Sequence, residues 1–436
     1  MTDLRASDEI QGNVLTPFPD GEQAFLLLHF ADAEGARALL AEILPGLTTT
    51  ASLLSSPPRV CRGVGFTASG LRKLAPLWAA GLEPFLAFRE GPAVRAPRLR
   101  DHGPSAPERW VFGTLDPGVD AVLTLASAEP AAAGEEAAHW QERSRALGVH
   151  CLFDQRGARL PGIMAGCEHF GFKDGISQPA VRGFDRAPAG LLPAGEFILG
   201  RPRLAAGGGE AEPLPCPDWM CDGSFQVLRR LSQDVAGWRA QLARLAASLS
   251  PERPMCPHQL AAKLMGRWQS GTPLALSPDR DDHSPPEAEY DYNDDPFGYK
   301  TPRFAHARKM YPRDDAFFEK DWHRIIRRGI PFGPIYEPGS ETAGAERGLL
   351  LNAFMASLEN QFEFLMRGWA NDPDFIEAGD GPDPLIGESG EPATLRHPEG
   401  CPTALRFERF VHTTGAVYAF VPARSVVARL AAGEGT

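Results

Sequence analysis

Residues 169–179, with the sequence HFGFKDGISQP, contain one aspartate, Asp174, among glycines and aromatic residues. Carboxylates are among the side chains that transfer protons in enzyme active sites. Gly171 and Gly175 would let the backbone approach a bulky ligand closely. An Asp-Gly pair is first of all a turn signal, so this stretch alone favours a loop residue without a chemical role.

A second segment, FAHARKMYPRDD at 304–315, combines one histidine with several cations. His306 is followed by Arg308, Lys309 and Arg313. Cations grouped in this way can hold an anionic ligand, for example the propionates of a haem. A basic surface patch with an incidental histidine explains the same pattern, and without further context the segment favours the surface patch.

A third segment, WHRIIRRGIPFGP at 322–334, places two arginines directly after an apolar pair. Because neighbouring residues of a strand face opposite sides, one of Arg327 and Arg328 is expected to point inward. A buried arginine requires a partner, and either a carboxylate or a bound anion would serve.

The elements around these segments alternate between strands and helices. The apolar run at 22–30 is followed by helical spacing through Ala36, Leu39 and Ile43, and residues 59–74 repeat the pattern. A strand at 121–127, a helix at 135–147 and a strand at 150–155 complete a split βαβ, or ferredoxin-like, order. A second round is predicted from GEFIL at 195–199, a strand and helix at 224–249, GLLLNAF, the helix at 358–369, FERFVHT and AVYAFVP.

Composition excludes several functional classes. The 436 residues carry a net charge of −12, which disfavours non-specific binding to nucleic acid. No stretch approaches the roughly 20 apolar residues of a membrane span, and the first residues do not resemble a secretory signal. The seven cysteines form neither a CxxC pair nor a CxxCH haem-attachment motif. A reduced, cytoplasmic location is therefore expected, with no membrane partner.

Two long stretches read as exposed loops. Residues 277–298 are acidic and proline-rich, and their DYNDDPFG resembles half a calcium loop. Pro296 stands where such a loop needs glycine, so a solvated connection is favoured over a calcium site. Residues 372–392 are also predicted to be an exposed loop. The chain contains no P-loop, GxSxG or HExxH motif.

Taken together, the three segments resemble those of the dye-decolorizing peroxidases. HFGFKDG is similar to the family's GxxDG motif, AHARKMYPR to its proximal-histidine segment and RRGIPFGP to its distal-arginine segment. Further similar segments occur in the family's order, so the resemblance covers nearly the whole chain and points to one of the longer subclasses without an export signal. These segments are EIQGNVL, GEFILG, DGSFQVLRRLSQDV, AAKLMGRWQSGTPL and GLLLNAF.

The resemblance implies an α+β fold of two ferredoxin-like domains with antiparallel sheets. We expect one domain at 1–180, ending at the GxxDG loop, and a second at 181–436 that binds non-covalent haem b. His306 matches the axial iron ligand and Asp174 the distal acid-base residue. Arg327 matches the distal arginine, because the family keeps an Arg-x-(Gly/Asn)-x-Pro spacing, and Arg313 matches a haem-propionate contact.

The implied function is a haem peroxidase that reduces hydrogen peroxide and oxidises dyes, phenolics or other organic donors through a ferryl intermediate. Two alternatives remain: a haem-binding sensor or carrier of the same fold without significant turnover, and a haem-free dimeric interaction protein. Retention of a distal acid, an arginine and a ligand histidine disfavours the sensor. A homo-oligomer, the physiological reductant and oxidation of manganese are left open.

Some finer assignments also remain open. A carboxylate bonded to the proximal histidine would increase its electron donation, and Glu359 and Glu363 lie in the expected region, although a solvated helix face is favoured for both. Trp322, Tyr336 and Trp369 are candidates for relaying electrons to the surface, although aromatic residues more often pack in a core or rim. The chain departs from the family pattern at two places, with Thr301-Pro-Arg303 before the histidine segment and Leu351 where an aromatic residue is common.

Overall fold

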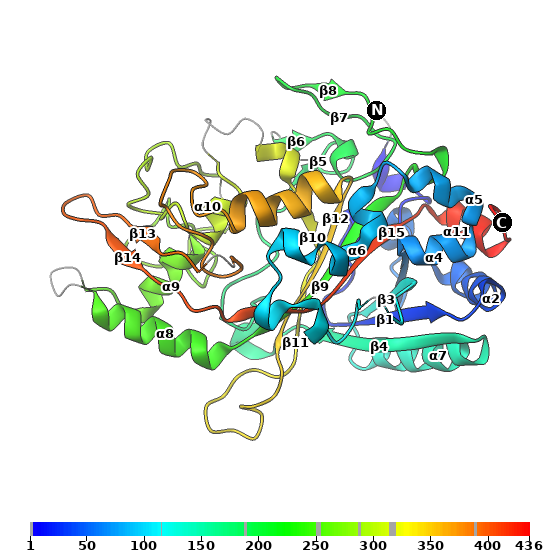
Figure 1. Ribbon diagram of the computed structural model, residues 1–436, viewed down its shortest axis with the longest axis horizontal. Helices are drawn as coiled ribbons and strands as arrows, with labels where there is room; N and C mark the ends of the chain where they lie inside the picture. Colours follow the sequence, from blue (N-terminus) through cyan, green and yellow to red (C-terminus); the bar gives the residue numbers. More distant parts are fainter. Residues whose placement is uncertain are drawn as a thin grey trace.

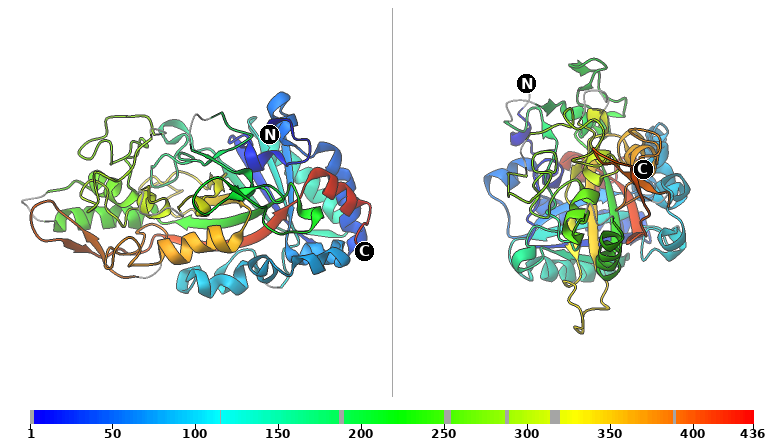
Figure 2. Two further views of the ribbon diagram at one scale, coloured as in Figure 1. Left: turned by 90° about the horizontal axis from the view of Figure 1, so that it is seen from above. Right: turned by 90° about the vertical axis from the view of Figure 1, so that its left-hand side faces the viewer.

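A computed structural model shows one extended antiparallel sheet flanked by helices, with both chain termini at the same end of the molecule (Figures 1 and 2). The opposite end carries helix α8 and the small hairpin β13–β14. The structure describes residues 3–114, 116–186, 190–249, 254–286, 289–313, 320–387 and 390–436. No helix in these ranges is long and apolar enough to cross a membrane.

The first four long strands form one half of this sheet. They are β1 (Glu22–Phe30), β2 (Cys61–Phe66), β3 (Ala121–Ser127) and β4 (Val149–Ala158). Their spatial order is β2-β3-β1-β4, and all their pairings are antiparallel. Two helices that pack against these strands, α2 (Ala33–Ile43) and α7 (Ala132–Ala146), supply the βαββαβ connectivity of a ferredoxin-like unit.

The second half of the sheet repeats this arrangement. Its strands are β9 (Ser224–Gln233), β10 (Ile326–Arg327), β11 (Ile330–Phe332), β12 (Gly348–Met355) and β15 (Val411–Val421). The order is β10-β12-β9-β15, with β11 also paired to β12, so each half has the spatial order second, third, first, fourth along the chain. One pair, Phe420 opposite Phe66, joins the halves. The predicted α+β class of two ferredoxin-like units is confirmed, whereas the boundary at 180 remains a prediction.

Local sequence explains why these elements form. All but two residues of β1 are buried, because the strand lies inside the sheet and its long apolar run is covered on both faces. Helix α2 begins at Asp32, whose side chain accepts a hydrogen bond from the Gly35 amide, and it buries the apolar face predicted by its spacing. The largest core cluster draws on both halves of the sheet, including Leu26, Phe66 and Phe225.

Further helices and short strands complete the fold. The helices are α1 (Gly12–Leu15), α3 (Thr50–Ser55), α4 (Ala68–Leu74), α5 (Pro76–Ala79), α6 (Leu86–Arg95), α8 (Val235–Ser248), α9 (Pro257–Met265), α10 (His306–Met310) and α11 (Arg424–Ala431). The π-helical segments η11 (Leu358–Phe362) and η12 (Leu365–Ala370) follow β12. The short strands are β5 (Ala180–Val181), β6 (Leu191–Leu192), β7 (Arg203–Leu204), β8 (Glu210–Ala211), β13 (Ala393–Leu395) and β14 (Thr403–Leu405).

The predicted strand GEFIL at 195–199 is wrong. Residues Ala194–Glu196 form a short 3-10 helix, and the backbone amide of Ile198 then bonds to the carbonyl of Ala194. The segment is buried throughout, so its apolar run could not distinguish a strand from a buried turn. FERFVHT is also strand only from Val411, because residues 406–410 have no regular structure.

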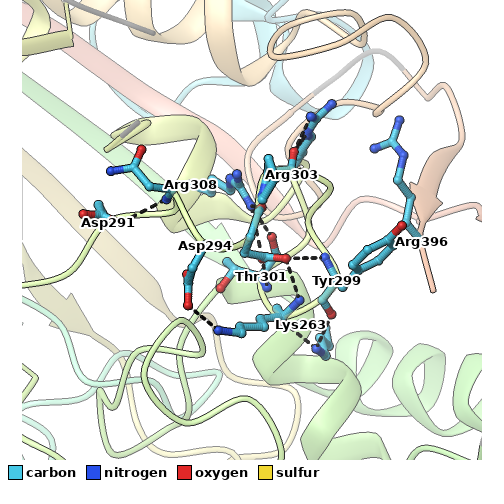
Figure 3. Close-up of polar contacts among 12 residues, drawn as sticks. Lys263, Asp291, Asp294, Tyr299, Thr301, Arg303, Arg308 and Arg396 are labelled. Carbon is cyan, nitrogen blue, oxygen red and sulfur yellow. Dashed lines mark hydrogen bonds and ion pairs between the residues drawn. The ribbon is translucent and has the colours of Figure 1, made fainter. Parts of the chain in front are cut away.

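The two predicted loops are less exposed than expected. In 372–392, residues 380–385 are all buried, so the prediction of an exposed loop is wrong for that part. In 277–298, Asp295 is buried and its carboxylate accepts hydrogen bonds from the backbone amides of residues 299, 300 and 301. The same carboxylate lies 3.3 Å from Arg308 Nη1, which ties this loop to α10. Figure 3 shows Arg308 in this polar network together with Lys263 and Thr301.

Candidate active site

A large cavity lies between α10, the loop at 168–177, strand β12 and the π-helical segments. Together with the open space at its mouth, it encloses about 1650 Å³. The four residues singled out by sequence, which come from three distant segments, all line it: Asp174, His306, Arg313 and Arg327. Much of the remaining wall is apolar, with residues such as Leu231, Leu349, Leu351, Phe362, Leu365 and Met366.

His306 is the first residue of α10, and its ring is fixed by a carboxylate. Its Nδ1 lies 2.7 Å from Oδ2 of Asp383, which is buried. Oδ1 of Asp383 accepts hydrogen bonds from the backbone amides of Leu385 and Ile386, at 2.8 and 3.1 Å. A carboxylate partner makes Nδ1 the proton-bearing nitrogen and leaves Nε2 for a ligand in the cavity.

The candidates Glu359 and Glu363 for this partner are therefore wrong. Glu363 is buried in an ion pair with Arg95 of α6, with a distance of 2.9 Å from Arg95 Nε to Oε1. Glu359 accepts a hydrogen bond from the backbone amide of Ala87. The favoured solvated face is wrong for Glu363 as well, because the π-helical segment packs against α6 rather than facing water.

Sequence reasoning missed Asp383 because it lies in the loop that was predicted to be exposed. The only local indication is the stretch GPDPLIG at 381–387, in which two prolines flank an acid directly before apolar residues. The two prolines restrict the backbone on both sides of this aspartate, although nothing in its spacing connects it to His306.

The loop that carries Asp174 is held by a second buried acid. Glu168 accepts hydrogen bonds from the amides of Phe170 and Phe172, both at 2.9 Å, and from the side-chain amide of Gln233. Burial raises the pKa of Glu168 to about 7, against the lowering effect of these donors. Between the two phenylalanines, Gly171 has φ +97°, a conformation that favours glycine.

The carboxylate of Asp174 is exposed to the cavity space and is not used to hold its own loop. Its backbone amide donates to Gly166 O at 3.0 Å, while its side chain makes no hydrogen bond with the described residues. A Cβ atom at Gly329 would lie 3.6 Å from Asp174 Oδ2 and only 3.0 Å from Leu350 O. Glycine at 329 therefore keeps the space beside this carboxylate open.

Arg327 and Arg328 point to different partners. Arg327 lines the large cavity, and its Nη2 donates to Ile176 O at 2.5 Å, two residues after Asp174. Its Nε is buried without a hydrogen-bond partner in the described part of the chain. Arg328 instead donates to Leu15 O at 2.6 Å and Asn13 O at 3.2 Å, at the C-terminal end of α1.

A second cavity meets the first at Asp174 and Arg327. It shares these two residues and Gly329 with the large cavity. Its other walls come from the N-terminal segment after α1, the end of β4 and the loop around Phe184. Asp174 and Arg327 can therefore be reached from two sides.

Arg313 belongs to a group of cations on the wall of the large cavity. Its Nη2 donates to Ser177 Oγ at 2.7 Å, its guanidinium lies 4.1 Å from the centre of the Tyr290 ring, and its Nε is buried without a partner among the described residues. Arg267 and Arg324 line the same cavity. Arg267 bonds to backbone carbonyls and to the Tyr290 hydroxyl, and Arg324 bonds to Ser177 O. Such neutral acceptors leave positive charge available for an anionic ligand.

The remaining candidates lie outside this constellation. Trp369 is buried and stacks on Phe375 with ring centres 5.0 Å apart, and it contacts the ring of His323, which lines the large cavity. Trp322 and Tyr336 are partly buried and do not line the cavity. Their role as electron relays remains a prediction. Leu351, the departure from the family pattern, does line the cavity.

Known proteins resemble this chain over nearly its whole length. The dye-decolorizing peroxidase of Exidia glandulosa is 31% identical over 441 residues, covering 95% of this chain and 85% of the relative. The multifunctional dye peroxidase of Amycolatopsis is 30% identical over 432 residues, covering 90% and 88%. No family model matches the chain.

Solved structures resemble it equally broadly. A dye-decolorizing peroxidase in complex with 2,6-dimethoxyphenol superposes with a TM-score of 0.84 at 26% identity, covering 97% of this chain and 99% of the other. The dye-decolorizing peroxidase of Auricularia auricula-judae superposes with a TM-score of 0.80 at 27% identity, with the same coverage.

Replacement of Arg328 should reduce stability. In Arg328→Leu, the last carbonyls of α1 lose their charged donor, so we expect the free energy of unfolding to fall by about 2–4 kcal/mol. Urea denaturation measures this change. Arg159→Leu is the control, because Arg159 lines the same second cavity but is exposed, and it should change stability by less than about 0.5 kcal/mol. Equal effects of the two substitutions would contradict a bracing role for Arg328.

Proposed function

Since this chain belongs to the dye-decolorizing peroxidase family of haem enzymes, which reduce hydrogen peroxide, we propose that His306 holds its haem iron and that Asp174 and Arg327 act on the peroxide. The observation that carries this proposal is a single cavity lined by a carboxylate-bonded histidine and by an unengaged acid next to an arginine. The donors we propose are dyes and phenolics such as 2,6-dimethoxyphenol, which is bound in a related structure.

The residues of the large cavity fit a haem. Nε2 of His306 has no hydrogen-bond partner among the described residues, and the apolar walls suit a flat macrocycle. The buried, unpaired Nε of Arg313 fits a propionate, with Arg267 and Arg324 on the same wall. None of the described residues that line this cavity is a cysteine, which supports non-covalent haem b. When bound, the haem supplies the redox chemistry that cleaves the O–O bond of peroxide and passes oxidising equivalents to donors.

His306 and Asp383 form the proximal side of the proposed site. The Asp383 carboxylate accepts a hydrogen bond from Nδ1–H. This bond fixes the ring and increases the electron donation of Nε2. The two backbone amides on Oδ1 keep the carboxylate in place. The imidazole thus acts as an oriented, electron-rich ligand.

Asp174 is proposed to move the proton of hydrogen peroxide. Cleavage of the O–O bond with release of water requires a proton to pass from one peroxide oxygen to the other, which then leaves as water. The carboxylate can accept and return that proton because the described residues leave its oxygens without hydrogen bonds. The second cavity, which meets the first at Asp174, offers a route by which small molecules can reach it.

Arg327 is proposed to stabilise negative charge on the departing oxygen. Its guanidinium is fixed by Ile176 O, and its unpaired Nε–H remains available for a ligand. A donor held in advance at the place where charge develops lowers the barrier more than a mobile one does.

The alternative is a haem-binding sensor or carrier of the same fold. A Soret band in the purified protein supports haem binding, and peroxide-dependent oxidation of an anthraquinone dye or of 2,6-dimethoxyphenol supports the peroxidase over the sensor. A Soret band without oxidation would favour the sensor, and no Soret band after haem addition would favour the haem-free interaction protein. A cytoplasmic location and the oligomeric state remain predictions.

Loss of His306 should remove the haem. His306→Ala should bind little haem, or bind it with an altered ligand spectrum, as measured by the Soret absorbance relative to protein. His323→Ala is the matched control, because His323 also lines the cavity, and it should keep the wild-type spectrum. Normal haem content and spectrum in His306→Ala with loss in His323→Ala would transfer the ligand role to His323.

Arg327→Leu should keep the haem but slow the reaction with peroxide. Loss of a preorganised electrostatic group predicts a decrease of about 10²-fold or more in the rate of this reaction. Stopped-flow mixing with peroxide measures the rate. Arg328→Leu, studied where it remains folded, should be much milder, because Arg328 is bonded to α1 rather than facing the large cavity. The reverse order of effects would mean that the two roles are assigned one residue off.

Asp174→Asn should preserve the loop and the haem but abolish most turnover. Asparagine tolerates such turns but cannot accept and return a proton, so we expect turnover to fall by about 10²–10⁴-fold. Dye oxidation at saturating peroxide measures it, with Asp20→Asn as the control at the wall of the second cavity. If Asp174→Asn turned over as fast as wild type, Asp174 would be only a turn residue.

A further inference from the structure

Helix α10 carries a buried lysine as well as the histidine. Lys309 lies three residues after His306 and is 0% exposed. Its Nζ donates to two backbone carbonyls, Asp372 O at 2.7 Å and Gly381 O at 2.8 Å. Burying an ammonium group is costly unless its donors are used, so such a lysine needs a structural reason. Neither the proposed peroxide chemistry nor the cation group around Arg313 uses it.

The two carbonyls belong to the two ends of one loop. The amide of Gly381 bonds to Pro373 O, which closes the loop, and Asp383 follows two residues later. We propose that Lys309 is a positioning residue of the proximal site: by holding both ends of the loop 372–381, its ammonium group keeps Asp383 bonded to His306 Nδ1. This inference rests on the proposed role of His306.

One helix carries both the histidine and the lysine. α10 extends from His306 to Met310, so the histidine and the lysine that fixes its partner's loop move together. Other cations also hold this loop. Arg396 pairs with Asp380 and Arg303 with Glu377, and both arginines are labelled in Figure 3. Both of these pairs join side chains, whereas Lys309 bonds to the backbone carbonyls at the two ends of the loop from which Asp383 continues.

The positive charge of Lys309 supports the same role as its hydrogen bonds to the loop. The carboxylates of Asp383, Asp372 and Asp380 favour the charged form of Lys309, although burial, the larger effect, lowers its pKa to about 8. The ammonium form therefore predominates at neutral pH. In this form Nζ carries three N–H groups, which can donate to both carbonyls.

The test is the iron–histidine stretching frequency of the ferrous haem protein, measured by resonance Raman spectroscopy. This frequency falls when the hydrogen bond from Nδ1 weakens. Asp383→Asn sets the size of the full effect. Lys309→Met keeps the side-chain length but removes the donors. It should lower the frequency by at least half of the decrease seen in Asp383→Asn. Lys309→Arg, which keeps charge and donors, should restore most of it, and Arg396→Met should shift it little.

The outcomes separate this inference from the function on which it rests. If wild type shows no iron–histidine stretch, or if Asp383→Asn leaves it unchanged, the assignment of His306 and Asp383 fails. If Asp383→Asn lowers the frequency while Lys309→Met matches wild type, the inference about Lys309 alone is overturned.

If the Lys309→Met protein does not retain haem, a second measurement tests the inference. Hydrogen exchange followed by mass spectrometry on the haem-free proteins reports the loop directly. The peptide spanning 372–387 contains the amides of Leu385 and Ile386 that donate to Asp383. It should exchange faster in Lys309→Met than in wild type, while peptides from β1 and β3 remain unchanged. Equal exchange in 372–387, or a general increase through the protein, would overturn the inference.

Discussion

The hydrogen bond between His306 Nδ1 and Asp383 is the interaction on which the architecture of the proposed site depends. It joins the start of α10 to a loop about 77 residues farther along the chain, and neither segment could orient the ring alone. Helix α10 is held to the 277–298 segment by the buried pair of Arg308 and Asp295, and Lys309 of the same helix bonds to two backbone carbonyls of the loop before Asp383.

A second set of hydrogen bonds joins Arg327 to the loop that carries Asp174. The side chain of Gln178 donates to the carbonyl of Arg327 and accepts from its amide, as a neighbouring strand would. With the bond from Arg327 to Ile176 O, this attaches the loop of Asp174 to the edge of the sheet at β10. Among the described residues, the side chain of Asp174 takes no part in these bonds. Loop rigidity and a free carboxylate are compatible here because separate residues provide them.

The sequence predicts the elements of this fold in which apolar residues recur at a regular spacing. The strand at β1, the helices α2 and α7 and the order of elements follow from apolar spacing. The choice of His306, Asp174 and Arg327 rests on the resemblance to the peroxidase family, because the local stretches around the first two, taken alone, favour a surface patch and a turn. The partner of His306 cannot be predicted in this way, because no local pattern shows what Glu363 and Asp383 meet after folding: Arg95 of α6 for one, an imidazole for the other. GEFIL fails for a related reason, since a fully buried apolar run is compatible with a strand or a turn.

The most direct test of this account is a crystal structure of the haem-loaded protein. We expect iron bonded to Nε2 of His306, Asp383 still bonded to Nδ1, and Asp174 with Arg327 on the opposite face of the macrocycle. Arg313 should lie at a propionate. Iron bonded to another side chain, or Asp174 and His306 on the same face of the haem, would contradict it.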